Sequence, residues 1–179
     1  MKKILIVIDM QNDFIDGALG SPEAQAIVPV VSEKISSYKN MSDRVIIYTR
    51  DTHKDNYLNT QEGKLLPIPH CICGTQGWQI VDGLYQEGSL IEDKITFGST
   101  WLPQYIMSNY KGRIGGIELI GVCTDICVVS NAMILKAHFP EVPIAVDASC
   151  CAGTSVEAHN AALTVMKSCQ IEIHNEKAV

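Results

Sequence analysis

The chain has 179 residues, of which 46% are hydrophobic and 19% are charged, a composition typical of a globular protein. Its formal net charge of −6 argues against a nucleic-acid partner, because phosphate backbones are bound by clustered Lys and Arg residues. The length suits one domain with its own core, so we expect a single domain over residues 1–179 that acts on small molecules.

The first apolar run, residues 4–8, is too short for a membrane-spanning helix, which needs about 20 apolar residues. It leads directly into Asp9, unlike the apolar segment of a secretory signal. The seven cysteines are odd in number and fall within strand and helix patterns, which favours a reducing compartment. We therefore expect a cytoplasmic protein with no membrane partner and at least one free thiol.

Short β-branched runs without strict alternation predict strands that are buried on both faces of a sheet. These runs cover residues 4–8, 44–49, 118–122 and 144–146, and an alternating run at 170–174 suits an edge strand. Helices are predicted over residues 22–39, 102–110, 124–138 and 155–167. The first helix has a start signal, Ser21 followed by Pro22. The alternation predicts a three-layer α/β/α fold with a doubly wound, mostly parallel sheet and right-handed crossovers.

Polar residues at the ends of the predicted strands are the first candidates for a site, because open parallel sheets bind ligands beyond the carboxyl ends of their strands. Asp9 ends the first run, Asp51 follows the second, and Cys127 lies shortly after the run at 118–122. The sequence therefore predicts that two carboxylates and a thiol converge.

Cys127 is expected in the first turn of a helix capped by Thr124 or Asp125, where free backbone N–H groups favour an anion. Lys94 is a candidate for a nearby cation, although a single lysine is more often a solvated surface charge. Both features lower the pKa of a thiol, so they favour an activated cysteine nucleophile.

A second group of candidates lies in the long irregular segment from residue 51 to about residue 90. Asp51, His53 and His70 offer carboxylate and imidazole ligands for a divalent ion, with Glu62 as a possible fourth. Three protein ligands leave coordination positions open, as a catalytic metal requires.

Three blocks of the sequence resemble the signature of the isochorismatase-like cysteine hydrolases, in that family's order. They are residues 9–14 (Asp-Met-Gln-Asn-Asp-Phe), Lys94, and residues 121–128 (Gly-Val-Cys-Thr-Asp-Ile-Cys-Val). The resemblance implies that Asp9 is the general acid and base, that Lys94 orients and supports the pair, and that Cys127 is the nucleophile.

The resemblance also concerns the backbone around the nucleophile. It implies a cis peptide bond between Val122 and Cys123. It further implies an oxyanion hole formed by the backbone amides of Cys123 and Cys127.

Residues 51–75 are similar to the metal segment of the nicotinamidase branch, including the Gly-Thr pair after the second histidine. This resemblance implies a divalent ion, zinc first and otherwise iron or manganese, held by Asp51, His53, Glu62 and His70. It implies hydrolysis of nicotinamide to nicotinate and ammonia through a thioester, a reaction of NAD salvage, and a homo-oligomeric enzyme. The sequence leaves open whether Asp9 or the metal activates the second water.

The ring pocket departs from that pattern in one respect. Phe14 matches an aromatic residue that packs on the substrate ring, but residues 66–69 (Leu-Pro-Ile-Pro) lack the aromatic common before the second histidine. Phe97 and Trp101 are the candidates to replace this stacking surface, although each is more often plain packing.

Three alternative readings stay open. The same machinery suits hydrolysis of another small amide or a ureido compound. A metal-thiolate or redox module built on residues 70–73 and 150–151 is disfavoured, because these cysteines lack Cys-x-x-Cys spacing. A catalytically silent binding protein is disfavoured because Asp9, Lys94 and Cys127 are all present.

Overall fold

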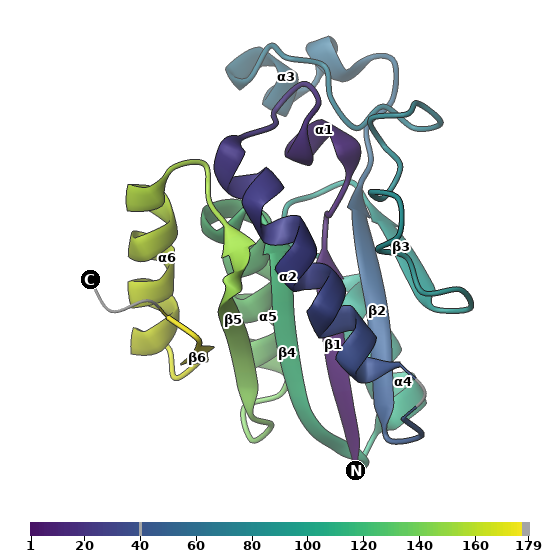
Figure 1. Cartoon of the computed structure of the whole chain (residues 1–179), viewed down its shortest axis with the longest axis vertical. Coiled ribbons are helices and arrows are strands. Elements are labelled where there is room, and N and C mark those ends of the chain that lie inside the picture. Colours follow the sequence, from purple (N-terminus) through teal and green to yellow (C-terminus); the bar gives the residue numbers. More distant parts are fainter. Residues whose placement is uncertain (40, 177–179) are drawn as a thin grey trace.

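The computed structural model describes residues 1–39 and 41–176. One sheet has the strand order β3-β2-β1-β4-β5-β6, and each neighbouring pair is parallel (Figure 1). The strands are β1 (Lys2–Ile8), β2 (Arg44–Asp51), β3 (Leu90–Lys94), β4 (Ile114–Val122), β5 (Ile144–Ala152) and β6 (Glu172–His174). The predicted parallel α/β architecture is confirmed.

The helices cover both faces of this sheet. They are α1 (Asn12–Ile15), α2 (Pro22–Tyr38), α3 (Gln61–Leu65), α4 (Trp101–Tyr110), α5 (Val129–His138) and α6 (Val156–Ser168). A 3₁₀ helix (Tyr57–Asn59) and a π-helix (Thr124–Val128) complete the set. In the described part of the chain, no helix is long and apolar enough to cross a membrane.

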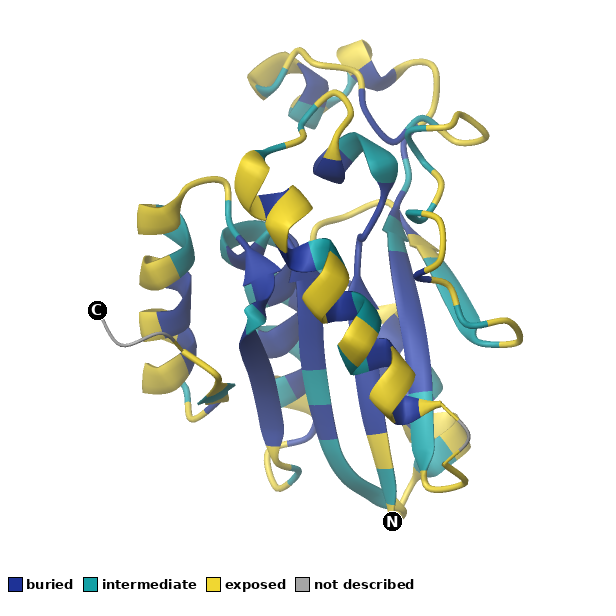
Figure 2. Ribbon diagram, viewed as in Figure 1, coloured by how far each residue is buried: buried dark blue, intermediate teal, exposed yellow. Residues whose placement is uncertain are grey.

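The side chains of β1 show why the molecule has three layers. Leu5 and Val7 pack into an apolar cluster with α2, whereas Ile4, Ile6 and Ile8 pack into a second cluster with α4, α5 and α6. Because successive strand residues point to opposite faces, one fully apolar run supplies both cores. Figure 2 shows the resulting buried central strands beneath helices whose outer faces are exposed.

The strands β3 and β5 differ from the sequence prediction. The strand β3 was not predicted, because its sequence Leu-Ile-Glu-Asp-Lys is charged and only partly buried, as suits its place at the edge of the sheet. The strand β5 continues to Ala152, beyond the predicted end at residue 146. At the opposite edge, β6 lies where the alternating run predicted an edge strand.

The helix that carries Cys127 begins differently from the prediction. Its first turn is a π-helix with Cys123 as N-cap residue, and the predicted caps are occupied elsewhere. Thr124 Oγ1 lies 2.8 Å from His159 Nδ1, and the Asp125 carboxylate accepts hydrogen bonds from Thr154. The cap prediction is therefore wrong, because both side chains bond to the segment at the start of α6.

Candidate active site

Three adjacent strands end together and place three charged side chains side by side. The parallel register pairs Ile8 with Thr49 and Asp51 with Lys94, so Asp9, Asp51 and Lys94 leave the sheet at the same level. Asp9 has a positive φ of 48°, which turns the chain sharply at the end of β1.

The predicted triad comes together at this edge of the sheet. Lys94 Nζ lies 2.6 Å from Asp9 Oδ2 and donates a hydrogen bond to Cys127 Sγ at 3.5 Å. It also lies 3.6 Å from Asp51 Oδ1. Lys94 is only 3% exposed, so it is a buried ion-pair partner and not a solvated surface charge.

A glycine on β4 permits the close approach of that strand to β1. Gly121 has a φ of 118°, and a Cβ atom at this position would lie 2.0 Å from the carbonyl oxygen of Ile8. Any side chain there would clash with the residue that precedes Asp9, so only glycine fits.

The Cys127 thiol is not an activated thiolate at rest. Burial raises its pKa well above the ordinary value, the negative charge of Asp9 adds to this shift, and the positive charge of Lys94 only partly opposes it. The expectation of a thiol pKa lowered by the helix terminus and Lys94 is therefore wrong. The neutral thiol needs a base.

The nearest base is Asp9. Burial raises the pKa of its carboxyl group, although Lys94 and a 2.6 Å hydrogen bond from Thr49 Oγ1 work in the other direction. Burial also opposes the charge of Lys94, but the carboxylate of Asp9 holds the pKa of Lys94 above its usual range. Asp9 is thus a stronger base than an exposed aspartate, beside a lysine that stays charged.

The four predicted metal ligands form one cluster beside the triad. The ligand atoms of Asp51, His53, Glu62 and His70 all lie within 4.8 Å of one another. Burial opposes the charge of Asp51, but the two histidines and Lys94 lower the pKa of Asp51 below its usual range. The set therefore combines a firmly ionised carboxylate with two imidazoles, as zinc, iron and manganese accept.

The two imidazoles are oriented as metal ligands usually are. His70 Nδ1 lies 2.8 Å from the Ile68 carbonyl oxygen, so that its Nε2 faces the cluster. His53 Nε2 is buried and, among the described residues, makes no hydrogen bond, although Asp51 Oδ2 lies 2.8 Å away. A buried nitrogen without a hydrogen bond fits a site that a divalent ion completes.

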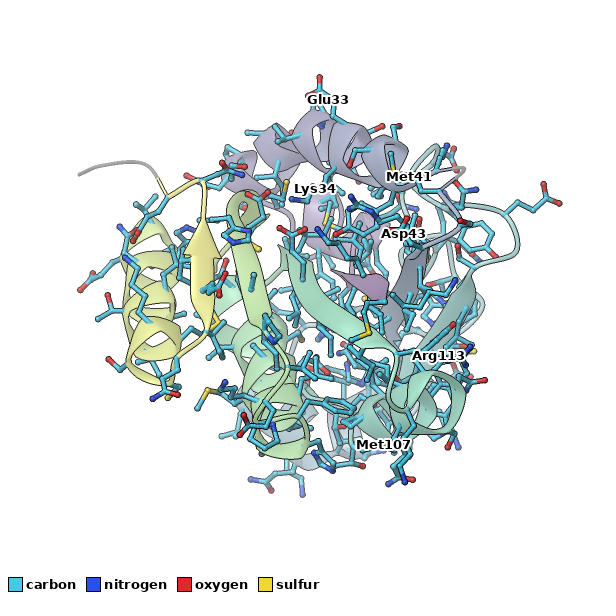
Figure 3. The ribbon with its side chains drawn as sticks, turned by 90° about the horizontal axis from the view of Figure 1, so that it is seen from below. Glu33, Lys34, Met41, Asp43, Met107 and Arg113 are labelled. Carbon is cyan, nitrogen blue, oxygen red and sulfur yellow. The ribbon has the colours of Figure 1, made fainter. Side chains whose placement is uncertain are left out.

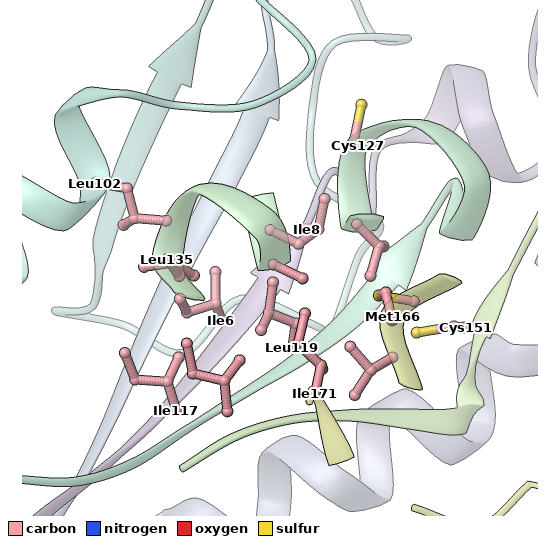
Figure 4. Packing of buried hydrophobic residues seen from close by; sticks show 14 of the residues in the cluster. Ile6, Ile8, Leu102, Ile117, Leu119, Cys127, Leu135, Cys151, Met166 and Ile171 are labelled. Atoms are coloured by element: carbon pink, nitrogen blue, oxygen red, sulfur yellow. The ribbon is translucent and has the colours of Figure 1, made fainter. Parts of the chain in front are cut away.

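A cavity of about 450 Å³ opens in front of these groups. Its wall includes Asp51, Glu62 and His70 from the cluster, together with Cys123 and Cys127. In Figure 4 the sulfur of Cys127 points away from the apolar core residues Ile8 and Leu119 beneath it. The nucleophile candidate thus faces a space large enough for a small ligand.

The predicted aromatic residues divide into two groups. Phe14 and Phe97 line the cavity, and the Phe14 ring lies 5.5 Å from the His70 ring. Trp101 is not among the lining residues, because it starts α4 and stacks on Tyr105 of the next turn at 5.0 Å. The prediction that Trp101 contacts substrate is therefore not supported.

Two residues of the first signature block hold the site together, and the sequence analysis gave them no role. The Gln11 side chain accepts from Asp51 N at 2.7 Å and donates to Asp51 O at 2.9 Å. Asp13 Oδ2 accepts from Cys71 N at 2.7 Å, next to His70. Their polar character directly after a buried strand was the available signal.

The backbone next to the nucleophile helix has one unusual bond. The peptide bond between Val122 and Cys123 is cis, which confirms the expectation from the family resemblance. Val122, Cys123 and Cys127 all line the cavity.

Comparison with known proteins gives a consistent result. The Isochorismatase domain family matches residues 3–176. A nicotinamidase of Schizosaccharomyces pombe is 28% identical, over 97% of this chain and 93% of that protein. A pyrazinamidase of Pyrococcus horikoshii, solved in complex with zinc, is 31% identical with a TM-score of 0.82, over 97% of this chain and 98% of that chain. A pyrazinamidase/nicotinamidase from Streptococcus mutans is 28% identical with a TM-score of 0.83, over 96% of this chain and 99% of that chain.

The chain therefore belongs to the isochorismatase family of hydrolases. Within that family it falls in the nicotinamidase-like branch, and it is an amide-hydrolysing enzyme.

Proposed function

We propose that the protein is a cysteine-dependent, metal-assisted amidohydrolase that converts nicotinamide to nicotinate and ammonia. One observation carries this proposal: Lys94 Nζ lies between Asp9 Oδ2, at 2.6 Å, and Cys127 Sγ, at 3.5 Å, beside a cavity that also contacts a metal-compatible cluster. A base, a cation and a thiol in this order suit acyl transfer from an amide.

The first half of the reaction forms a thioester. Asp9 takes the proton of the Cys127 thiol while the sulfur attacks the amide carbon. The backbone amides of Cys123 and Cys127 donate hydrogen bonds to the oxyanion, and such donors are worth roughly 3 to 4 kcal/mol each. Asp9 then passes its proton to the amide nitrogen, the C–N bond breaks, and ammonia leaves.

The second half restores the thiol. Asp9 takes a proton from a water molecule as that water attacks the thioester carbon. The C–S bond breaks, the proton returns from Asp9 to Cys127, and the carboxylic acid leaves and loses its own proton to solvent. Throughout both halves Lys94 stays protonated, so its charge stabilises whichever of the two neighbours is negative.

Asp51, His53, Glu62 and His70 are the residues that would hold the divalent ion, with zinc as our first choice. Bound there, the ion supplies a Lewis acid for the ring nitrogen of the substrate and for a water molecule. Its role in activating the second water is left to experiment.

The cavity wall supports an uncharged substrate. No lysine or arginine is present among the described residues that line the cavity. A substrate carboxylate would therefore find no lysine or arginine on this wall, and the charge of a divalent ion there would be offset by the Asp51 and Glu62 carboxylates that hold it. This disfavours anionic ureido acids among the alternatives and favours a neutral carboxamide.

The lining of the pocket supports a ring. Phe14 and Phe97 supply aromatic surface, while Leu66, in the segment where many nicotinamidases carry an aromatic residue, also lines the wall. An aliphatic wall still packs on a ring, but it restricts the shape of the substrate less. A second candidate function is therefore hydrolysis of another small neutral amide.

A substrate panel tests the proposal. Ammonia release would be measured with the metal-loaded enzyme on nicotinamide, an aliphatic amide of similar size, and an anionic ureido acid. We expect the highest kcat/KM for nicotinamide and no turnover of the ureido acid. Preference for the aliphatic amide would favour the second candidate, and turnover of the ureido acid alone would contradict the proposal.

The cytoplasmic location and the homo-oligomeric state stay predictions.

A further inference from the structure

A buried amide side chain joins the segment that follows Lys94 to the helix that carries Cys127. Asn131 lies on α5, one turn after Cys127, and is fully buried. Its Nδ2 donates to the carbonyl oxygens of Cys127 at 2.8 Å and of Phe97 at 3.1 Å. Its Oδ1 accepts from Ser99 N at 2.9 Å. A single side chain thus bonds to three backbone groups from two segments of the site.

The backbone at Gly98, between the Phe97 and Ser99 groups that Asn131 binds, packs tightly against α5. A Cβ atom at Gly98 would lie 2.6 Å from Ile134 Cδ1 and 3.1 Å from Ser130 Cβ. The backbone of this segment therefore lies directly on α5, where a side chain at position 98 would push it away. This packing does not depend on the Asn131 hydrogen bonds, and it too places the segment that follows Lys94 against α5.

Lys94 and Phe97, at the two ends of this segment, are held in place by different contacts. Lys94 is held by strand pairing, because it lies opposite Asp51 in the register of β3 and β2. Phe97 lies beyond the strand, and its side chain is 45% exposed, so its own packing fixes it poorly. The bond from Asn131 supports the Phe97 carbonyl oxygen directly, while Ser99 is also held through its hydroxyl group by Glu92 and the start of α4.

We propose that Asn131 is a positioning residue that holds Phe97 on the cavity wall and keeps the segment that follows Lys94 against the helix that carries Cys127. It contacts neither the cavity nor the reacting atoms; it acts through the backbone of the residues that do. Loss of the amide should therefore weaken substrate binding through Phe97 more than it slows the chemical step.

The kinetic arm of the test rests on the proposed function. Asn131→Ala should raise KM for nicotinamide about 10-fold with a smaller fall in kcat, a size expected for a displaced binding group. In a Phe97→Ala background the same change should raise KM no further, because the group that Asn131 positions is gone. If each substitution raises KM by its own factor and the two factors multiply in the double variant, the proposal is overturned.

The matched control is Asn109→Ala. Asn109 Nδ2 donates to Tyr105 O at 2.9 Å, also across one helical turn, but Asn109 is exposed on α4. We expect wild-type kinetics from it. If Asn131→Ala fails to fold, Asn131→Leu serves instead, because it fills a similar buried volume without a charge and removes both donor bonds. The same rise in KM is expected from it, and an unchanged KM would overturn the proposal.

A second arm needs no knowledge of the substrate. The rate of Cys127 alkylation by iodoacetamide would be followed by mass spectrometry on the Cys127 peptide, with the Cys169 peptide as internal reference. We expect the rate of Cys127 alkylation in Asn131→Ala to differ several-fold from that of the wild type, and the rate in Asn109→Ala to equal it. If the wild type fails to hydrolyse nicotinamide while this change is present, the proposed substrate fails and the role of Asn131 stands. Equal alkylation rates in the wild type and both variants would overturn that role.

Discussion

Among the described residues, a lysine on the sheet and a lysine on α2 each lie between two carboxylates, and only the first belongs to the active site. The first is Lys94. The second is Lys34 of α2, whose Nζ lies 2.8 Å from Glu118 Oε1 and 2.9 Å from Asp147 Oδ2. Figure 3, viewed from the end where the strands begin, shows Lys34 on the inner side of α2 and Glu33 projecting outward.

The two clusters differ in how many of their polar atoms are already bonded. Asp147 accepts hydrogen bonds from Lys34, Ser149 and Asn175. Although burial opposes the charge, these bonds hold the pKa of Asp147 below its usual range. In contrast, burial raises the pKa of Asp9, and among the described residues its Oδ2 has only the ionic contact with Lys94. A saturated carboxylate stabilises the fold, whereas one with spare basicity beside a thiol can move a proton.

The largest expected effect separates these two aspartates. Asp9→Asn should lower kcat at least about 10⁴-fold, because the variant has no base for the neutral thiol. Asp147→Asn should leave kcat unchanged and lower the free energy of unfolding by about 1–3 kcal/mol, because it weakens the pairing with Lys34. Initial rates and urea unfolding curves measure both. Loss of activity in Asp147→Asn, or its retention in Asp9→Asn, would break the comparison.

Two histidines offer the next contrast. His70 belongs to the metal cluster, whereas His174 of β6 lies 3.1 Å from Glu118 beside Lys34. His70→Ala should lower metal content and cut kcat/KM by about 10- to 100-fold, because one ligand is lost. His174→Ala should change neither quantity.

Metal analysis and activity after dialysis against a chelator measure this contrast. The chelated wild type should lose activity and recover it with added zinc, iron or manganese. An enzyme fully active without metal would contradict the role of the cluster. Equal metal content in His70→Ala and the wild type would contradict the ligand assignment.

The opposite pKa shifts of the two aspartates predict a pH window in which the enzyme is folded but inactive. Asp9 must be ionised to act, so activity is lost as pH falls through its raised pKa, above the ordinary value of 3.8. The stability that Asp147 contributes is present above that ordinary value and is lost only as pH falls through its lowered pKa.

Rate profiles and unfolding midpoints at the same pH values measure this window, with metal content as the control for ligand protonation. Activity and folding that are lost together as pH falls would contradict the contrast.

The smallest expected effect concerns the exposed His174. Its hydrogen bond with Glu118 raises the pKa of His174 above the ordinary value of 6.5. Its stabilising contribution is therefore present at low pH and is lost as pH rises through the raised pKa. The stability difference between wild type and His174→Ala should shrink as pH rises from the ordinary value of 6.5 through the raised pKa of His174. A stability difference that grows as pH rises would show that the pKa of His174 is not raised by folding.

The sequence predicted the parts of the site that follow from strand ends. Asp9, Asp51 and Cys127 were found because polar residues after apolar runs meet at one edge of a parallel sheet. Lys94 was harder to place, since β3 is short, charged and half exposed, and its burial depends on pairing with β2. Only the family resemblance singled out Lys94 with a definite role.

Other features depend on three-dimensional contacts that no local pattern records. The π-helix at Thr124–Val128 is bonded to the segment at the start of α6, and Trp101 stacks on Tyr105 outside the cavity. The raised pKa of Cys127 follows from its burial beside Asp9, which sequence spacing cannot measure. Asn131 is one of several polar residues on α5, and its three partners are known only from the fold.

The most direct test of the central claim is trapping of the acyl-enzyme. Wild type and Cys127→Ala would be mixed with nicotinamide, quenched with acid within milliseconds, and examined by intact-protein mass spectrometry, with ammonia release followed in parallel. We predict an added nicotinoyl group on the intact wild type, located on the Cys127 peptide after digestion, and neither adduct nor ammonia from a folded Cys127→Ala. Ammonia release by Cys127→Ala at a rate near that of the wild type would contradict the account.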